Sequence, residues 1–156
     1  MTGSFHAYRI VKTKWADSAF DGEGARVFGG RWNRKGVGCV YLASSESLAM
    51  LEMLVHLNAT QLADAYTLFK LTIPEDDVLS LDLSALPANW QDDPAPVETA
   101  SIGGEWIASL ASVGLRVPST IVAREQNVLL NPRHPKFAAI IKTARKLQFG
   151  FDARLK

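Results

Sequence analysis

The pattern of apolar and polar positions along the 156 residues predicts a mixture of strands and helices. Short apolar runs bounded by turn residues predict strands over residues 5–12, 37–43, 66–73, 78–83, 117–123 and 128–130. Apolar positions at helical spacing predict helices over residues 45–58 and 97–113. Because strands and helices do not alternate regularly, the pattern favours an α+β fold over a doubly wound sheet.

Local signals predict how several of these elements begin, end and pair. Residues 37–43 are apolar on both alternating faces, which is typical of a central strand. Pro74 is expected to end the strand 66–73, with residues 78–83 returning beside it as a hairpin. Gly114 is well placed to end the second helix.

The remaining segments are predicted to be loops or short elements. Residues 21–30 contain four glycines and are predicted to form a turn-rich loop. Residues 86–96 are rich in proline and acidic side chains and are predicted to form a second, long loop. Two prolines fix a loop at 131–135. Residues 137–143 fit either a helix or a strand, and residues 147–151 favour a strand.

A carboxylate stands in the most apolar of the predicted helices. Between residues 48 and 57 the polar side chains are Glu52 and His56, four apart and therefore on one helix face. A buried carboxylate is unfavourable unless another group pairs with it or uses it. His56 is expected to be structural or to be a partner for Glu52.

Composition limits the class of protein. Hydrophobic residues make up 47% of the chain and charged residues 21%, which is typical of a globular protein. We expect a single domain over residues 1–156. The formal net charge of +1 gives no basis for direct nucleic-acid binding. The N-terminus lacks a long apolar segment, so we expect no membrane span and a cytoplasmic protein.

Several common site types do not fit the sequence. The glycines near residue 30 match neither a P-loop nor a dinucleotide-binding fingerprint, and no serine lies in a G-x-S-x-G elbow. The single cysteine, Cys39, lies in an apolar run and is expected to be a core residue. The chain has three histidines, and Glu52 and His56 lack further ligands, so no metal site is expected.

Arginine, tyrosine and glutamate remain as a candidate set around the glycine-rich segment. Arginine suits bidentate recognition of phosphate, and a tyrosine ring can stack on a planar base. A carboxylate can stabilise an oxocarbenium ion, so the set suits a nucleotide whose ribosyl bond is cleaved. A buried structural ion pair between Arg31 and Glu52 explains the same residues, and on residue types alone it is slightly favoured.

The chain resembles the RES domain family, toxins of bacterial toxin–antitoxin pairs. The matching pieces run in the order Tyr8–Arg9, GGRWN at 29–33, Gly36, Tyr41, LEMLVH at 51–56, VPS at 117–119, LLNPRHPKF at 129–137 and FDARL at 151–155. Since the pieces cover nearly the whole chain, the match is specific.

The resemblance implies a fold and a function. It implies an ADP-ribosyltransferase-like split, mixed β-sheet flanked by helices. It implies an enzyme that arrests growth by degrading NAD at the nicotinamide–ribose bond, as a glycohydrolase or a phosphorylase. It also implies a hetero-oligomer with an Xre-like helix-turn-helix antitoxin that blocks the active site.

The family's motif maps onto particular residues of this chain. The implied catalytic residues are Arg31, Glu52, Ser119 and Tyr41. The implied NAD-binding residues are Arg9, Gly30, Trp32 and Asn33, where Trp32 and Asn33 either contact NAD or build the wall beside Arg31. Asn131 and His134 are expected to fix their loop.

In the hypothesis that combines these readings, Arg31 and Arg9 clamp the pyrophosphate and Tyr41 stacks on the nicotinamide. Glu52 stabilises the oxocarbenium ion, and Ser119 orients the ribose or the amide. The acceptor stays open between water, phosphate and a protein side chain, so the alternative function is a protein ADP-ribosyltransferase.

Overall fold

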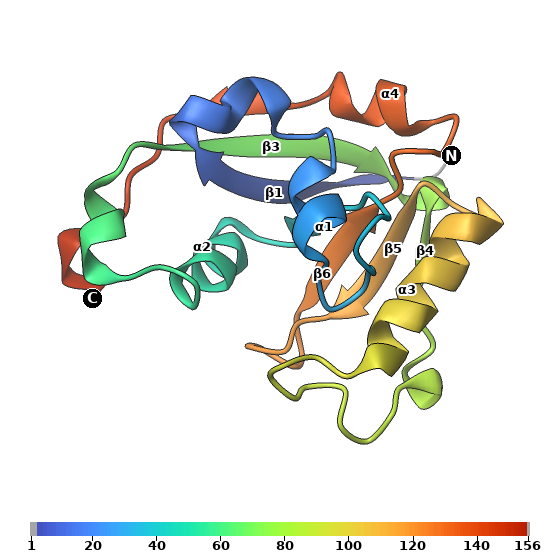
Figure 1. Cartoon of the computed structure of the whole chain (residues 1–156). Coiled ribbons are helices and arrows are strands. Elements are labelled where there is room, and N and C mark those ends of the chain that lie inside the picture. The colour runs from blue at the N-terminus through green and yellow to red at the C-terminus, as the bar shows by residue number, and fades with distance from the viewer. Residues whose placement is uncertain (1–2, 156) are drawn as a thin grey trace.

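Residues 3–155, which the computed structural model describes, form one seven-stranded sheet with helices on both faces (Figure 1). The strands are β1 (Ser4–Lys12), β2 (Val40–Ala43), β3 (Tyr66–Pro74), β4 (Val78–Ser80), β5 (Gly114–Pro118), β6 (Gln126–Leu130) and β7 (Arg145–Leu147). The α-helices are α1 (Glu23–Phe28), α2 (Glu46–Leu54), α3 (Val97–Ser109) and α4 (Phe137–Ile141). Short 3-10 helices are η1 (Thr13–Ser18), η2 (Ala59–Ala63), η3 (Glu75–Asp77), η4 (Leu83–Ala85) and η5 (Ala153–Leu155).

The sheet is mixed and split. Its strand order is β4-β5-β6-β2-β1-β3-β7, with β4 and β5 parallel and the other neighbours antiparallel. Every residue of β1 pairs with β3, whereas within residues 3–155 β1 and β2 pair at one position, Tyr8 opposite Ala43. The two halves of the sheet therefore diverge beside this pair. The predicted α+β class with a split, mixed sheet is confirmed, and the strand from 37–43 is central, as expected.

Helices pack on the two faces of the sheet through separate apolar clusters. Ile140 of α4 packs on the face that carries Val40 and Leu42. On the other face, α3 packs on β5 and β6 with the buried set Trp106, Ile107, Leu115, Val117 and Leu129. On that same face α2 packs beside β1 and β3 with the set Leu48, Ala49, Ile10, Ala43 and Leu68. Figure 1 shows α4 above β1 and β3, with α2 and α3 below them.

The helix that carries Glu52 begins where the sequence predicts and ends earlier. The backbone N–H of Leu48 donates to Ser45 Oγ at 3.1 Å, and Glu46 lies in the first turn, so the N-terminus is capped. The helix was expected to reach residue 58, but it ends at Leu54. The reason is that Asn58 caps the next turn, η2, through a capping box with Gln61.

One predicted strand pairing and one predicted helix end are wrong. Residues 78–83 form no hairpin with β3, because η3 carries the chain away after Pro74 and β4 then pairs parallel with β5. Gly114 does not end α3. That helix ends at Ser109, followed by the C-cap Leu110 with a φ of +54°, and Gly114 begins β5, where an added Cβ would lie 2.8 Å from Val78 Cγ2.

Other segments differ from the expectation in length. The strand predicted over 117–123 ends at Pro118, because Ser119 Oγ accepts from the N–H groups of Ile121 and Val122 and turns the chain. The glycine-rich segment 21–30 contains α1 rather than being a loop throughout. Residues 137–143 contain α4, and the last strand is 145–147 instead of 147–151. The loops 86–96 and 131–135 are confirmed.

Within residues 3–155, no helix has the length and apolar character needed to cross a membrane.

Candidate active site

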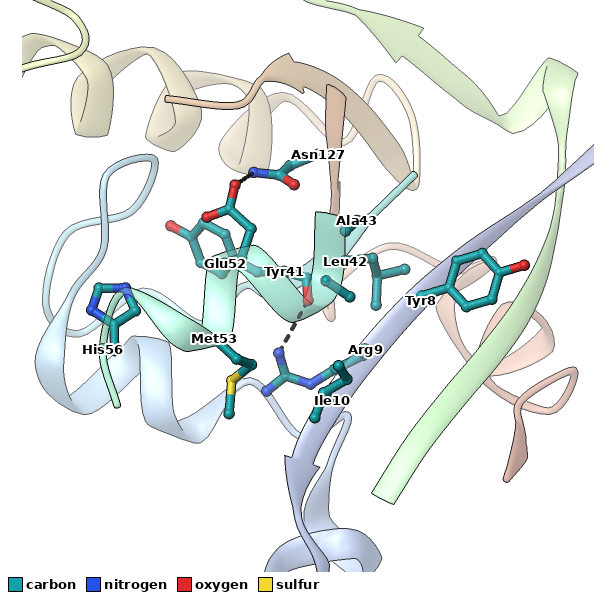
Figure 2. Close-up of a pocket in the computed structure, with 11 residues that line it drawn as sticks. Tyr8, Arg9, Ile10, Tyr41, Leu42, Ala43, Glu52, Met53, His56 and Asn127 are labelled. Atoms are coloured by element: carbon teal, nitrogen blue, oxygen red, sulfur yellow. Dashed lines mark hydrogen bonds between the residues drawn. The ribbon is translucent and has the colours of Figure 1, made fainter. Parts of the chain in front are cut away.

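The candidate site is a pocket of about 220 Å³ between α2 and the split of the sheet (Figure 2). Strands β1 and β2, the α2 region and β6 all contribute to its lining. Apolar side chains such as Ile10 and Met53 form much of the wall. The polar side chains that line the pocket are Tyr8, Arg9, Tyr41, Glu52, His56 and Asn127. The pocket thus brings together three residues selected from the sequence, Arg9, Tyr41 and Glu52.

Glu52 is half-buried and held through one of its two oxygens. Its Oε1 accepts a hydrogen bond from Ser119 Oγ at 2.8 Å and another from Asn127 Nδ2 at 2.8 Å. These donors are 67 and 75 residues away along the chain. The apolar helix therefore tolerates Glu52 because two polar side chains from the end of β5 and from β6 stabilise it.

Ser119 reaches the site through Glu52. It is fully buried and does not line the pocket. Because its Oγ accepts from the N–H groups of Ile121 and Val122, both at 3.1 Å, its own proton is directed to Glu52. The side chain thus donates to the carboxylate and does not line the pocket, whereas the sequence hypothesis gave it the ribose or the amide to orient.

Arg9 lies in the split between β1 and β2. Its Nε donates to Ala19 O at 2.7 Å and its Nη1 to Tyr41 O at 3.0 Å. Figure 2 shows the second of these bonds crossing from β1 to β2. Burial lowers the pKa of Arg9, and the nearby Cys39 and Asp21 oppose this shift. Among the ion pairs of residues 3–155, none includes Arg9.

Tyr41 lines the pocket with its hydroxyl fixed at the far end. The hydroxyl donates to Asn33 Oδ1 at 2.5 Å and accepts from the Trp32 N–H at 3.1 Å. Burial raises the pKa of the Tyr41 phenol, so it stays protonated. Gly30 makes room for this arrangement, because an added Cβ would lie 2.6 Å from the Tyr41 hydroxyl oxygen.

Trp32 and Asn33 belong to the wall behind Tyr41. Both are buried, with exposed fractions of 3% and 1%. Asn33 Nδ2 donates to Ala25 O at 2.8 Å and Val37 O at 2.9 Å, which fixes the segment after α1. Neither residue lines the pocket, so their geometry fits wall-building rather than direct contact with a ligand.

Arg31 is held outside the pocket lining. Its Nη1 donates to Trp90 O at 2.7 Å and to Asp92 O at 2.8 Å, so it joins the glycine-rich segment to the loop 86–96. Within residues 3–155, no ion pair of 4.0 Å or less joins it to Glu52. The structural Arg31–Glu52 pair considered from the sequence is therefore wrong.

Two other residues considered from the sequence, Cys39 and Asn131, have structural roles. Cys39 is buried, and burial raises the pKa of its thiol to about 12, which confirms it as a core residue. Asn131 Nδ2 donates to Ile107 O at 2.9 Å, and its Oδ1 accepts from the Arg133 N–H, so it fixes its loop. Among residues 3–155, no cluster of three or more His, Cys, Asp or Glu side chains is arranged to hold a metal ion.

Asn127 was missed by the sequence reasoning. It lies in β6, next to the apolar run from Val128 to Leu130. An amide beside such a run is the signal that could have selected it, although nothing nearby in the sequence indicates Glu52 as its partner.

The comparisons with known proteins give the family. The sequence profile of the RES domain matches residues 6–152. The chain belongs to the RES domain family.

Two of its relatives match along nearly the whole chain. "Toxin Res" of Yersinia enterocolitica serotype O:8 / biotype 1B is 47% identical over 149 residues, which cover 96% of this chain and 98% of that protein. A "Prs ADP-ribosylating toxin" of Sphingobium sp. (strain YBL2) is 37% identical, covering 99% and 98%.

A solved structure shares the fold. The match is a chain in the crystal structure of the M. tuberculosis MbcT–MbcA toxin–antitoxin complex, with a TM-score of 0.72 and 22% sequence identity. It covers 99% of this chain and 88% of that one.

Proposed function

We propose that this RES-domain protein is the toxin of a toxin–antitoxin pair and that it cleaves the nicotinamide–ribose bond of NAD. The toxin role rests on the names of its near-full-length relatives. The chemistry rests on one observation above the others. The Glu52 carboxylate, fixed through Oε1, faces a pocket that also contains a half-buried arginine, Arg9, without an ion-pair partner in residues 3–155.

Glu52 stabilises the charge that develops on the ribose. The bond between the nicotinamide nitrogen and the anomeric carbon breaks, and both electrons go to the nicotinamide ring. The ribose ring then carries oxocarbenium character, which a preorganised carboxylate stabilises. Water adds to the anomeric carbon and loses one proton, so the products are ADP-ribose, nicotinamide and a proton.

Arg9 and Tyr41 bind the two ends of the reacting half of NAD. The Arg9 guanidinium, already placed by two carbonyl oxygens, binds the pyrophosphate. The Tyr41 ring, fixed at its hydroxyl, stacks on the nicotinamide. Arg31 and Gly30 act from outside the lining, Arg31 by holding the loop 86–96 and Gly30 by leaving room for the Tyr41 hydroxyl. Ser119 acts through Glu52.

A second candidate function is transfer of ADP-ribose to a protein. One relative carries the name "Prs ADP-ribosylating toxin", and this specifically favours the candidate. The same site serves both reactions, since they differ in the acceptor. NAD labelled in its ADP-ribose part distinguishes them, because free labelled ADP-ribose supports hydrolysis and labelled protein supports transfer. Label in ADP-ribose 1″-phosphate when phosphate is supplied supports phosphorolysis.

The partner is an antitoxin with an Xre-like helix-turn-helix domain that covers the pocket. The structural neighbour comes from a toxin–antitoxin complex, which supports a hetero-oligomer. The formal net charge of +1 leaves DNA binding to the antitoxin. The pair acts in the cytoplasm, where NAD is consumed.

The deciding experiment uses Glu52→Gln, which keeps the size of the side chain and removes its charge. We expect NAD consumption to fall roughly a hundred- to thousandfold while the thermal midpoint stays near the parental value. Glu46→Gln, an exposed glutamate at the start of the same helix, is the control and keeps full activity. A folded Glu52→Gln protein that consumes NAD at the parental rate would show that the assignment is wrong.

A further inference from the structure

Asn127 is one of three polar residues of the pocket, with Tyr8 and His56, that the proposed function leaves without a role, and it is the one that contacts Glu52. Its Nδ2 donates to Glu52 Oε1 at 2.8 Å, and Ser119 Oγ donates to that same oxygen at 2.8 Å. No atom of residues 3–155 donates a hydrogen bond to the other oxygen, Oε2. Figure 2 shows the Asn127 amide meeting one oxygen of the carboxylate while the second is directed away from it.

The position of Asn127 is fixed by the sheet. In β6 it lies opposite Ala43 of β2 on one side and opposite Val117 of β5 on the other. A residue paired on both sides has little freedom to move its Cα atom. The amide is therefore carried by a strand paired on both sides, while Glu52 is carried by α2. The contact ties these two elements together at the pocket.

The amide makes this contact without satisfying its own acceptor. Asn127 Oδ1 is buried and has no hydrogen-bond partner in residues 3–155. A buried acceptor without a partner destabilises the folded state. Turning the amide over would not help, because Oδ1 would then face the Glu52 carboxylate. An apolar side chain of similar size would avoid this cost, so the contribution of Asn127 lies in its hydrogen bond to Glu52 rather than in its own burial.

We propose that Asn127 is a positioning residue that, with Ser119, presents Glu52 Oε2 to the ribose. This inference rests on the proposed function. Two donors on Oε1 fix the plane of the carboxylate, and Oε2 is left to interact with the substrate. Preorganisation of this kind acts on the transition state more than on substrate binding. The effect of Asn127 therefore belongs to kcat rather than KM.

The test compares Asn127→Leu with Asn131→Leu in the full-length protein. Asn131 is also buried, but both of its polar groups have partners and it lies outside the pocket. For Asn127→Leu we expect kcat for NAD to fall roughly ten- to a hundredfold, KM to stay within about twofold, and the thermal midpoint to equal or exceed the parental value. For Asn131→Leu we expect a lower thermal midpoint and an unchanged kcat of the folded protein.

A second variant and a crystal structure keep the result decisive. Asn127→Asp retains the shape and removes the donor, so it is expected to lose at least as much kcat as Asn127→Leu. In a crystal structure of Asn127→Leu, the Glu52 carboxylate is expected to rotate or to occupy more than one conformer. An unmoved carboxylate overturns the inference whatever the activity is. A kcat equal to the parental value in both variants also overturns the role of Asn127 and leaves the NAD-cleaving activity intact. If the parental protein itself consumes no NAD, the proposed function is contradicted instead.

Discussion

Arg9 and Arg31 are held in different ways at two sides of the candidate site. Arg9 lies in the split of the sheet, where it lines the pocket and donates to the carbonyls of Ala19 and Tyr41. Arg31 lies outside the lining and donates to two carbonyls of the loop 86–96. Neither forms an ion pair of 4.0 Å or less within residues 3–155. Arg9 is therefore part of the pocket wall, and Arg31 joins the glycine-rich segment to the loop 86–96.

This difference indicates that Arg9 is placed to bind an anion, whereas Arg31 is placed to hold the loop 86–96. Burying a cation without a counter-ion costs free energy, and the lowered pKa of Arg9 reflects this cost. A site that bears this cost is suited to an anionic ligand. At Arg31 the main-chain carbonyls already accept from the guanidinium, so its first effect is on the position of the loop 86–96. The comparison therefore predicts unequal effects when the two arginines are removed.

Of the two arginines, the larger effect is expected for Arg9→Met, which keeps an unbranched apolar stem and removes the charge. A hydrogen bond to a charged group contributes about 1.5–3 kcal/mol, so kcat/KM for NAD should fall roughly ten- to a hundredfold, chiefly through KM. Initial rates at varied NAD concentration measure this. Arg145→Met, at an exposed arginine of β7, is the matched control and should leave the rates unchanged. An unaltered KM in folded Arg9→Met would remove Arg9 from the phosphate-binding role.

A smaller effect is expected for Arg31→Ala. Without the guanidinium, the loop 86–96 loses its tether to the glycine-rich segment, so its amides should exchange faster with deuterium. We expect kcat/KM to fall by about tenfold, the value for one or two lost hydrogen bonds. Arg34→Ala, which removes an exposed contact to Ser101, is the control. If Arg31→Ala instead raises KM as much as Arg9→Met and leaves the loop's exchange unchanged, both arginines bind the phosphates directly.

The sequence predicts the local elements around this site better than it predicts the contacts between residues that are far apart along the chain. Apolar runs and a serine cap were enough to predict the core strands and the start of the helix with Glu52, because such signals depend on neighbouring residues. The parallel pairing of β4 with β5 was not predictable, since it depends on a turn that redirects the chain. The contacts of Glu52 also join residues 67 and 75 positions apart. The family resemblance selected Ser119, but its hydrogen bond to Glu52 became visible only in the fold.

The smallest effect on activity is expected for Gly30→Ala, next to Arg31 and behind the Tyr41 ring. The new Cβ would lie 2.6 Å from the Tyr41 hydroxyl oxygen and 2.8 Å from Asn33 Oδ1, so the hydrogen bond between these groups must shift. We expect a loss of about 1–3 kcal/mol in the free energy of unfolding, measured by urea titration, and a fall of a few-fold in kcat/KM. Gly24→Ala is the control, because within residues 3–155 its added Cβ would meet no heavy atom within 4 Å beyond its chain neighbours and the backbone of its own helix. If Gly30→Ala is as stable as Gly24→Ala, the wall behind Tyr41 is looser than its hydrogen bonds indicate. The ring of Tyr41 would then be held by the pocket's apolar side chains rather than by its hydroxyl.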